Sequence, residues 1–330
     1  KVFRHMKAAI ATDIREIHCE EVPTPKPEQG MLTVDVELAA ICGSDLHVVY
    51  SEYWPSEGSP LIPGWPGHEG LGRVMDAGGS DFSPGELVLM LPSVASAGTF
   101  AEYTVINPNQ VLRLPDTKPH SELLMAQQLG TVIFACKRLP SLEGKTVVVI
   151  GQGTAGLFHD FVIRSLGAEY IIAIEPMPAR RALSKHMGAD TAIGVTGKPA
   201  TESVYNLTDG RGADVVIDAV GSVETLNQAL DIAGKDGRIA AFGLPTSRER
   251  VQFHWSTFLE KSQTMHAVHG GQLIPGLPDF RAAIDLIVSN EIDVSPLPTH
   301  TLPITQIKEA FDLAESRKDN AVKVLVSCKS

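Results

Sequence analysis

Cysteine is scarce and scattered in this chain of 330 residues. It occurs only at Cys19, Cys42, Cys136 and Cys328. None of these has a neighbour at the short spacing of a zinc finger, and such scattering in a long chain is typical of reduced thiols rather than of a disulfide framework. The opening residues, KVFRHMKAAIATD, also lack the apolar core of a signal peptide. We therefore expect a cytoplasmic protein.

Long apolar runs and an excess of positive charge are missing too. No apolar stretch approaches the ~20 residues that a membrane-spanning helix needs, so we expect no membrane insertion. The formal net charge of −11 argues against nucleic acid as a partner, because proteins that bind it usually carry basic patches. Hydrophobic residues at 43% and charged residues at 20% describe an ordinary globular protein, long enough for two domains.

The pattern of apolar residues changes along the chain. Before about residue 120, short β-rich segments such as MLTVDVELAAI and GELVLML are separated by glycine and proline, which indicates a β-barrel or sandwich. From Lys145 onward, valine- and isoleucine-rich strands such as KTVVVI alternate with helical segments, which is typical of a parallel sheet covered on both faces. The last strand-like segment, AVKVLVS, needs a partner strand, and we expect it to pair within the first domain.

A glycine-rich turn follows the KTVVVI strand and opens a helix. The segment GQGTAG fits the pattern GxGxxG with Gly151, Gly153 and Gly156, and Thr154 and Ala155 complete it. Between a strand and a helix, these glycines allow a tight turn, the close approach of a pyrophosphate and the packing of the helix on the strand. The sequence therefore predicts a dinucleotide site; the alternative is a glycine-rich turn without a ligand.

The next strand ends at Glu175, where a carboxylate can accept hydrogen bonds from the ribose hydroxyls of NAD and would repel the 2′-phosphate of NADP. Arg180 and Arg181 lie a few residues further on and weaken this argument, since a cation can accommodate part of the phosphate charge. We predict NAD rather than NADP as the cofactor. Arg180 and Val220 are further predicted cofactor contacts.

A second set of residues has the chemistry of a metal site. Cys42 lies in CGSDLH, and His68 and Glu69 lie in GHEG. A thiolate, an imidazole and a carboxylate together suit zinc, with one position open for water or substrate. Each side chain also has an ordinary alternative. Cys42 can be a small buried residue, His68 a hydrogen-bonded core histidine, and Glu69 an ion-pair partner of Arg73.

Five motifs, CGSDLH, GHEGLGRV, GTFAEY, GQGTAG and GADVVIDAVG, occur in this order. In this combination the chain resembles the zinc-containing medium-chain dehydrogenases/reductases, the alcohol dehydrogenase superfamily, and especially its sorbitol and glucose dehydrogenase-like members. The resemblance extends from Met6 to the C-terminus. It implies an α/β fold: a GroES-like, β-rich catalytic domain of residues 1–125 and 270–330, and a Rossmann domain with a doubly wound parallel sheet, residues 126–269.

The resemblance also implies roles for individual residues. Cys42 and His68 match ligands of the catalytic zinc, and Glu69 matches an adjacent carboxylate that is a direct ligand in some members. Asp45 matches a carboxylate that orients the ligand histidine; a turn cap is its alternative.

Ser44 and His47 match a proton relay that leads from the substrate hydroxyl, through the cofactor ribose, to solvent. The alternative for His47 is an ordinary exposed histidine. Tyr50, Tyr53 and Trp54 follow this segment as candidates for lining a substrate pocket or for surface contacts.

Two departures from the family pattern stand out. The family's third zinc ligand is a Cys, Glu or Asp, but this chain has Gln127 there, and a neutral amide is a poor zinc ligand. We expect either a shell of Cys42, His68, Glu69 and water, with Gln127 close by, or weakened zinc affinity. An ordinary polar helix residue is the alternative for Gln127. The segment PSVASAGTF also lacks the four cysteines of a structural zinc site, so we expect one catalytic zinc and no structural zinc.

These implications define a function: reversible, NAD(H)-linked hydride transfer between nicotinamide and a secondary alcohol, polyol or sugar, with zinc as the Lewis acid. The partner is then a small alcohol or carbonyl substrate. The segment TMHAVHGG resembles a strand that pairs across a two-fold axis in the family, which implies a homodimer or homotetramer. One alternative is a zinc-free NAD(P)H-dependent reductase of a quinone or enone. Another is a non-enzymatic NAD-binding protein, which the presence of Ser44 and His47 disfavours.

Overall fold

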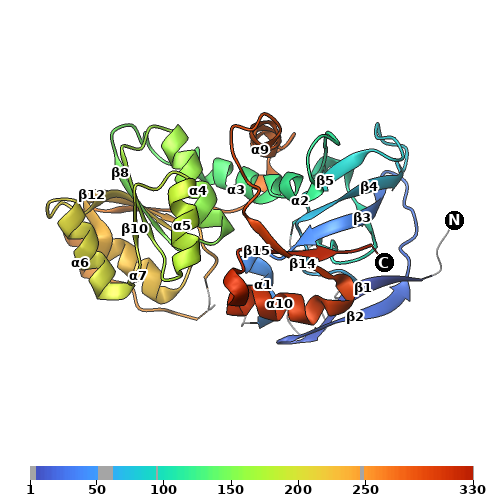
Figure 1. Ribbon diagram of the computed structural model, residues 1–330, viewed down its shortest axis with the longest axis horizontal. Coiled ribbons are helices and arrows are strands. Elements are labelled where there is room, and N and C mark those ends of the chain that lie inside the picture. The colour runs from blue at the N-terminus through green and yellow to red at the C-terminus, as the bar shows by residue number, and fades with distance from the viewer. Residues whose placement is uncertain (1–4, 51–61, 94–95, 246–248, 330) are drawn as a thin grey trace. The chain divides into compact units, whose positions relative to one another are not determined.

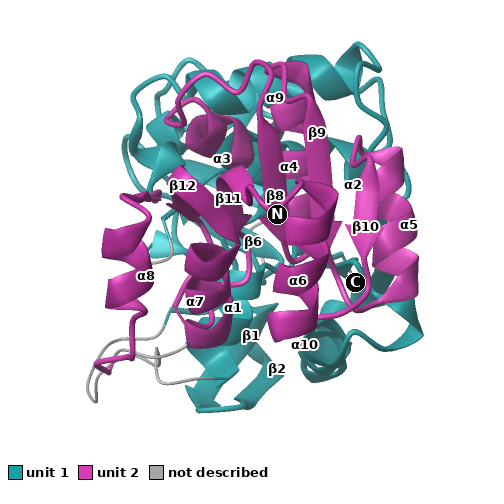
Figure 2. Cartoon of the chain, turned by 90° about the vertical axis from the view of Figure 1, so that its left-hand side faces the viewer, with its two compact units in different colours: residues 1–131, 270–330 teal, residues 132–269 magenta. Residues whose placement is uncertain are grey.

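The computed structural model describes residues 5–50, 62–93, 96–245 and 249–329. They form two compact units, which are coloured separately in Figure 2. The first unit comprises residues 1–131 and 270–330, and the second comprises residues 132–269. The predicted boundary at 125/126 lies at the start of helix α3 (Ala126–Cys136), and the two compact units divide within this helix. The second unit ends at His269, and the predicted domain bounds stay a prediction.

The first unit is built on a seven-stranded sheet with the order β14-β15-β3-β4-β5-β7, and β6 also pairs with β3. The strands are β3 (Leu32–Ala40), β4 (Gly70–Asp76), β5 (Leu87–Met90), β6 (Tyr103–Ile106), β7 (Val111–Arg113), β14 (Pro298–Pro303) and β15 (Lys323–Ser327). A separate hairpin joins β1 (His5–Asp13) to β2 (Glu16–Pro23). Strand β15 pairs antiparallel with β3, red beside blue in Figure 1. The expectation that the last strand returns to the first domain is confirmed.

Helices α1 (Gly43–Tyr50), α2 (His120–Leu123), α9 (Pro278–Val288) and α10 (Ile307–Ser316) complete the first unit, together with the start of α3. Alternate side chains of β3, among them Leu32, Val34 and Val36, are fully buried in its core. Phe311 of α10 joins this core and meets the ring of Phe100 edge-on, with centroids 5.6 Å apart. The alternation of apolar residues in β3 therefore directs one face of this strand into the core, as its period of two indicates.

The second unit is a six-stranded parallel sheet with the order β10-β9-β8-β11-β12-β13. Its strands are β8 (Thr146–Ile150), β9 (Tyr170–Ile174), β10 (Thr191–Ile193), β11 (Ala213–Asp218), β12 (Ala233–Ala241) and β13 (Thr264–Ala267). Its helices are α4 (Thr154–Ser165), α5 (Pro178–His186), α6 (Gly197–Leu207), α7 (Val223–Ile232) and α8 (Trp255–Glu260). From β8 the chain first builds outward to β10 and then resumes on the other side at β11. The carboxyl ends of β8 and β11 thus flank the switch point where doubly wound sheets bind ligands. The predicted fold class is confirmed.

No helix in the described part of the chain is long and apolar enough to cross a membrane.

Candidate functional site

Three predicted metal ligands come together in the first unit. Cys42 follows β3, while His68 and Glu69 directly precede β4, and the two strands are antiparallel neighbours. The end of one strand therefore meets the start of the other. The Cys42 Sγ, a ring nitrogen of His68 and a carboxylate oxygen of Glu69 all lie within 4.8 Å of one another. We call these three residues the metal centre; His68 and Glu69 are buried and Cys42 is half-buried.

Asp45 fixes the orientation of the His68 ring. Its Oδ1 lies 2.8 Å from His68 Nδ1, and its Oδ2 accepts a hydrogen bond of 2.8 Å from the backbone N–H of Cys42. Burial opposes a positive charge on His68, but Asp45 and Cys42 outweigh it and raise the pKa of His68 well above its ordinary value. With Nδ1 held by Asp45, Nε2 is the nitrogen that a metal would bind.

Ser44 and His47 lie on α1, three residues apart and therefore on one side of the helix. The Ser44 Oγ lies 3.2 Å from His68 Nε2, so this hydroxyl borders the metal centre directly. His47 is half-buried, one turn further along. The geometry is compatible with the predicted proton relay, which stays a prediction.

Glu69 has a partner that the sequence analysis did not identify. Lys323, the first residue of β15, is 2% exposed, and its Nζ lies 2.9 Å from Glu69 Oε1 and 2.7 Å from Oε2. Burial opposes the ammonium charge, but Glu69 and Cys42 raise the pKa of Lys323 above its ordinary value, so the ammonium stays charged. The suggested pair between Glu69 and Arg73 is not formed, because Arg73 binds Glu37 and Asp116 instead.

Helix α3 brings an amide to the metal centre. Gln127, the predicted neighbour of the zinc, is buried. The side-chain amide that contacts the metal centre belongs to the next residue, Gln128. Its Nε2 lies 3.9 Å from Cys42 Sγ, and its Oε1 lies 3.3 Å from Lys323 Nζ. The segment MAQQLG offers two adjacent glutamines, and the rotation of the helix decides which one faces a given neighbour. A role for Gln127 beside the metal stays a prediction.

The donor set fits zinc. Zinc binds thiolate, imidazole and carboxylate at about 2.0–2.3 Å, so donors in a tetrahedral site lie about 3.5 Å apart. The spacing within the metal centre needs only small side-chain movements to reach that geometry. No other cluster of three or more His, Cys, Asp or Glu among the described residues brings its ligand atoms this close.

In the second unit, the GQGTAG segment joins β8 to α4. Gly151 has a φ of +87°, and a Cβ there would stand 2.5 Å from Val220 Cγ2. A Cβ on Gly156 would stand 1.9 Å from the carbonyl oxygen of Gly151. These two glycines are therefore required by the turn and its packing. At Gly153, the N-cap of α4, a Cβ would meet nothing closer than Arg180 at 3.8 Å, which leaves room for a ligand beside the backbone.

Glu175, at the end of β9, lies against this turn and is 3% exposed. Its Oε2 accepts a hydrogen bond from the backbone N–H of Gln152, and its Oε1 accepts one from that of Met177, each at 2.9 Å. A carboxylate has about four lone-pair positions, so ribose hydroxyls can bind in addition to these two donors. Thr154 and Ala155 open α4, and their backbone lies at the positive end of the helix dipole.

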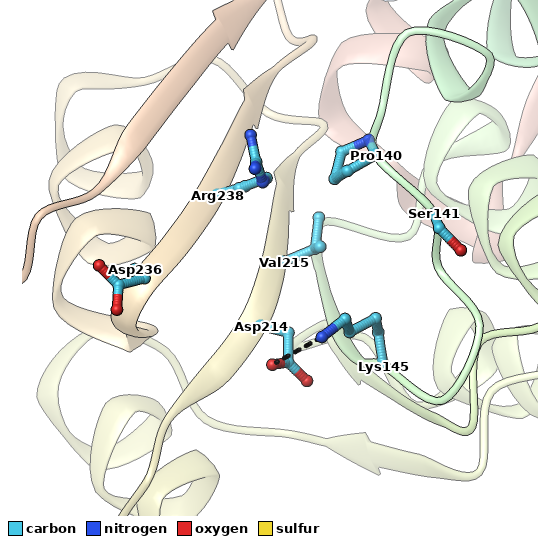
Figure 3. A pocket seen from close by; sticks show the side chains of 7 residues that line it. All are labelled: Pro140, Ser141, Lys145, Asp214, Val215, Asp236 and Arg238. Atoms are coloured by element: carbon cyan, nitrogen blue, oxygen red, sulfur yellow. Dashed lines mark ion pairs between the residues drawn. The ribbon is translucent and has the colours of Figure 1, made fainter.

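A cavity of about 270 Å³ lies elsewhere in the second unit (Figure 3). It is lined by Pro140, Ser141, Lys145, Asp214, Val215, Asp236 and Arg238. Lys145 directly precedes β8, and Asp214 lies at the start of β11, so the cavity is at the amino ends of these strands. Ligands of open parallel sheets bind at the carboxyl ends. The cavity is therefore not the dinucleotide site.

Tyr50 has a packing role. Its hydroxyl donates to Asp312 at 2.7 Å, its ring lies 6.0 Å from that of Phe311, and the guanidinium of Arg15 lies 4.4 Å above it. These contacts join α1 to α10. Tyr53 and Trp54, the other aromatic candidates, lie outside the described residues.

A parallel-sheet unit with a dinucleotide-type turn, in one chain with a cysteine–histidine–glutamate cluster, is the combination expected of a metal- and nucleotide-dependent enzyme. Residues 28–116 match the alcohol dehydrogenase GroES-like domain, and residues 156–289 match the zinc-binding dehydrogenase domain. Together the two segments cover more than half of the chain. The chain belongs to the zinc-dependent medium-chain dehydrogenase/reductase superfamily, as the sequence motifs predicted, and it is an oxidoreductase.

Full-length relatives agree with this assignment. An L-threonine 3-dehydrogenase of Coxiella burnetii (strain Dugway 5J108-111) is 26% identical over 328 residues, which cover 92% of this chain and 94% of the relative. A sorbitol dehydrogenase of Bacillus subtilis (strain 168) is 25% identical over 356 residues, with 98% of each chain covered. The structure of an alcohol dehydrogenase from Thermus sp. ATN1 has the same fold, with a TM-score of 0.84 at 24% identity, covering 98% of this chain and all of the other. None of these similarities supports the zinc-free alternative.

Proposed function

We propose that this oxidoreductase interconverts a small alcohol and its carbonyl compound with NAD(H) and a single catalytic zinc. The observation that carries the proposal is the metal centre, whose three donors lie within 4.8 Å of one another in a chain that also has the glycine turn with Glu175. The named substrates of the two relatives, threonine and sorbitol, both carry secondary hydroxyl groups. The substrate class is therefore a secondary alcohol, a polyol or a sugar.

Cys42, His68 and Glu69 would hold the metal in this proposal, with one position left for water or substrate. A bound zinc supplies Lewis acidity, which lowers the pKa of a coordinated hydroxyl so that it loses its proton near neutral pH. Asp45 accepts the Nδ1–H of His68, which keeps the Nε2 lone pair directed at the metal. The Lys323 ammonium compensates the charge of Glu69.

Ser44 and His47 move the proton. The Ser44 Oγ lies 3.2 Å from His68 Nε2. The Ser44 hydroxyl is thus placed to accept the proton of a substrate hydroxyl that would bind at the metal centre. His47, one turn along α1, passes it toward solvent, since an imidazole exchanges protons near neutral pH.

NAD is the proposed cofactor. The backbone N–H groups at the start of α4 receive the pyrophosphate, and the turn glycines leave room for it. Glu175 receives the ribose hydroxyls and disfavours a 2′-phosphate, while Arg180 lies beside Gly153, at the phosphate side of the turn. Strand β13 is an edge of its sheet, and we propose that it pairs with a second copy in a homodimer or homotetramer.

The test combines elemental analysis with a substrate screen. Enzyme purified from metal-replete medium should contain about one zinc per chain and should form NADH with at least one secondary alcohol, polyol or sugar. A chelator should abolish turnover and leave NAD binding intact. An enzyme without zinc that oxidises NAD(P)H with a quinone or enone would contradict the proposal.

A further inference from the structure

The side-chain amide of Gln128 lies between Cys42 of the metal centre and the buried ammonium of Lys323. Gln128 is the third residue of α3 and is half-buried. Its Oε1 lies 3.3 Å from Lys323 Nζ, and its Nε2 lies 3.9 Å from Cys42 Sγ. All three residues belong to the first unit. The mechanism above gives Gln128 no role.

Lys323 decides which end of this amide faces the sulfur. An ammonium group has three N–H donors and no acceptor, so only the oxygen of the amide can bind it. Lys323 Nζ also lies 2.9 Å from Glu69 Oε1 and 2.7 Å from Glu69 Oε2. Its donors therefore have acceptors in the two Glu69 oxygens and in Gln128 Oε1. With its oxygen held by Lys323, the amide presents its NH2 group to Cys42.

A hydrogen bond from this NH2 group suits the sulfur of Cys42. The 3.9 Å between Nε2 and Sγ is long for a hydrogen bond to oxygen but within reach of one to sulfur, whose atomic radius is larger. Metal binding requires the thiolate form of Cys42, and a charged acceptor strengthens such a bond.

The neutrality of the amide matters at this position. A carboxylate there would repel the Cys42 thiolate, and an ammonium group would repel a metal cation. An apolar side chain would leave one donor of the buried Lys323 without its acceptor, which costs stability. An amide serves both neighbours because it has an acceptor for Lys323 and a donor for Cys42.

We propose that Gln128 is a positioning residue of the metal centre, which donates a hydrogen bond to the Cys42 thiolate while Lys323 holds its amide in place. The hydrogen bond fixes the direction of the sulfur and withdraws electron density from it. A bound zinc then receives less charge from the thiolate and stays a stronger Lewis acid. Gln128 acts through Cys42 rather than on the substrate, and this inference rests on the proposed zinc site.

The test compares two variants of the full-length enzyme. Gln128→Met removes both ends of the amide at similar length and volume. Gln128→Glu has the shape of the wild-type side chain and keeps an oxygen for Lys323, but it has no N–H for Cys42. Gln110→Met is the matched control, because Gln110 is a half-buried glutamine of the first unit that lies beside β7 and outside the metal centre.

The measurement that reports on the sulfur is the absorption spectrum after zinc is replaced with cobalt(II). The charge-transfer band from thiolate to cobalt moves to longer wavelength when the sulfur loses a hydrogen bond, because its lone-pair electrons then lie higher in energy. Both Gln128 variants should show this shift, and Gln110→Met should not. Competition with a chelator should show that Gln128→Met binds zinc about tenfold more weakly than the wild type. NAD affinity should not change in any of the three variants.

The spectrum of Gln128→Glu decides the proposal. A band at the wild-type wavelength in this variant would overturn the hydrogen bond to Cys42, even if Gln128→Met binds less zinc, because only the contact with Lys323 would then matter. The same shift in Gln110→Met would also overturn it. A wild-type enzyme that binds neither cobalt nor zinc would overturn the proposed function together with this inference.

Discussion

The metal centre of the first unit is assembled from side chains far apart along the chain, whereas the proposed dinucleotide site of the second unit consists largely of one continuous stretch of backbone. Cys42, His68 and Glu69 come from two loops, and Lys323 joins them from the last strand. The dinucleotide turn needs its six consecutive residues and one carboxylate from the next strand. The first site depends on side-chain charge; the second depends on the space beside the backbone.

This difference predicts that the two sites can be damaged separately. Substitutions that change a charge should lower the metal content or the stability of the first unit. Substitutions that add a Cβ atom to a turn glycine should weaken nucleotide binding. The predictions below run from the largest expected effect to the smallest.

Cys42→Ala should abolish zinc binding and turnover, because the thiolate is the strongest zinc donor of the centre. NAD affinity should stay within about twofold of the wild type, since the dinucleotide turn lies in the other unit. Elemental analysis, NADH formation and NAD titration measure the three quantities. Cys19→Ala, at a half-buried position outside the centre, is the control. Turnover retained in Cys42→Ala would disprove the metal role.

Lys323→Met should destabilise the zinc-free protein by about 3–5 kcal/mol, because it leaves the buried Glu69 carboxylate without its cation. Zinc should stabilise this variant more than it stabilises the wild type, since the metal can compensate Glu69 instead. Denaturant unfolding with and without zinc measures both effects. Lys323→Met combined with Glu69→Leu should recover much of the lost stability. A double variant as unstable as the single one would show that the ion pair is not the cause.

Gly156→Ala and Gly153→Ala separate folding from binding within the dinucleotide turn. A Cβ at Gly156 would stand 1.9 Å from a backbone oxygen, so this variant should lose about 1–3 kcal/mol of stability as well as NAD affinity. A Cβ at Gly153 has room in the protein, so that variant should keep its thermal stability but bind NAD at least about tenfold more weakly. Both should keep their zinc. Equal stability of the two variants would contradict the packing argument.

Glu175→Ala should lower the preference for NAD over NADP about tenfold, because it removes the carboxylate proposed for the ribose hydroxyls. The ratio of kcat/KM for the two cofactors is the measurement. Ser165→Ala, at the exposed end of α4, is the control and should leave the ratio unchanged. An unchanged ratio in Glu175→Ala would place the ribose elsewhere.

Glu37 belongs to an ion-pair cluster with Arg73, His120 and Lys329, in the first unit but outside the metal centre. Burial raises the pKa of Glu37, but Lys329 and His120 outweigh it and hold this pKa below its ordinary value. The folded carboxyl group thus has a lower pKa than the unfolded one at about 4.3. Its stabilisation is present above that pH and is lost as the pH falls through the folded pKa. Glu37→Gln should flatten the acid limb of the stability curve and cost under about 1 kcal/mol at pH 7; an unchanged acid limb would contradict this.

Local patterns in the sequence determined much of the proposed dinucleotide site. Gly151, Gly153 and Gly156 lie within a segment of six residues, so the requirement for positive φ or close packing can be derived from their spacing and from the flanking strand and helix. The parallel sheet was predictable for the same reason, because its strands are continuous apolar runs. The candidates Cys42, His68 and Glu69 were visible as residue types, and the family motifs brought them together.

Tertiary structure alone decided how the charges of the metal centre are paired. Lys323 stands in an ordinary strand, AVKVLVS, and nothing local to it indicates Glu69, 254 positions away. The pairing follows from the sheet order, in which β15 and β4 both flank β3. Likewise, the rotation of α3 sets Gln128 against Cys42. The periodicity of apolar residues indicates which residues share a face of one helix or strand. Strand order and helix rotation depend on the packing free energy of the whole core, so they cannot be derived from any single segment.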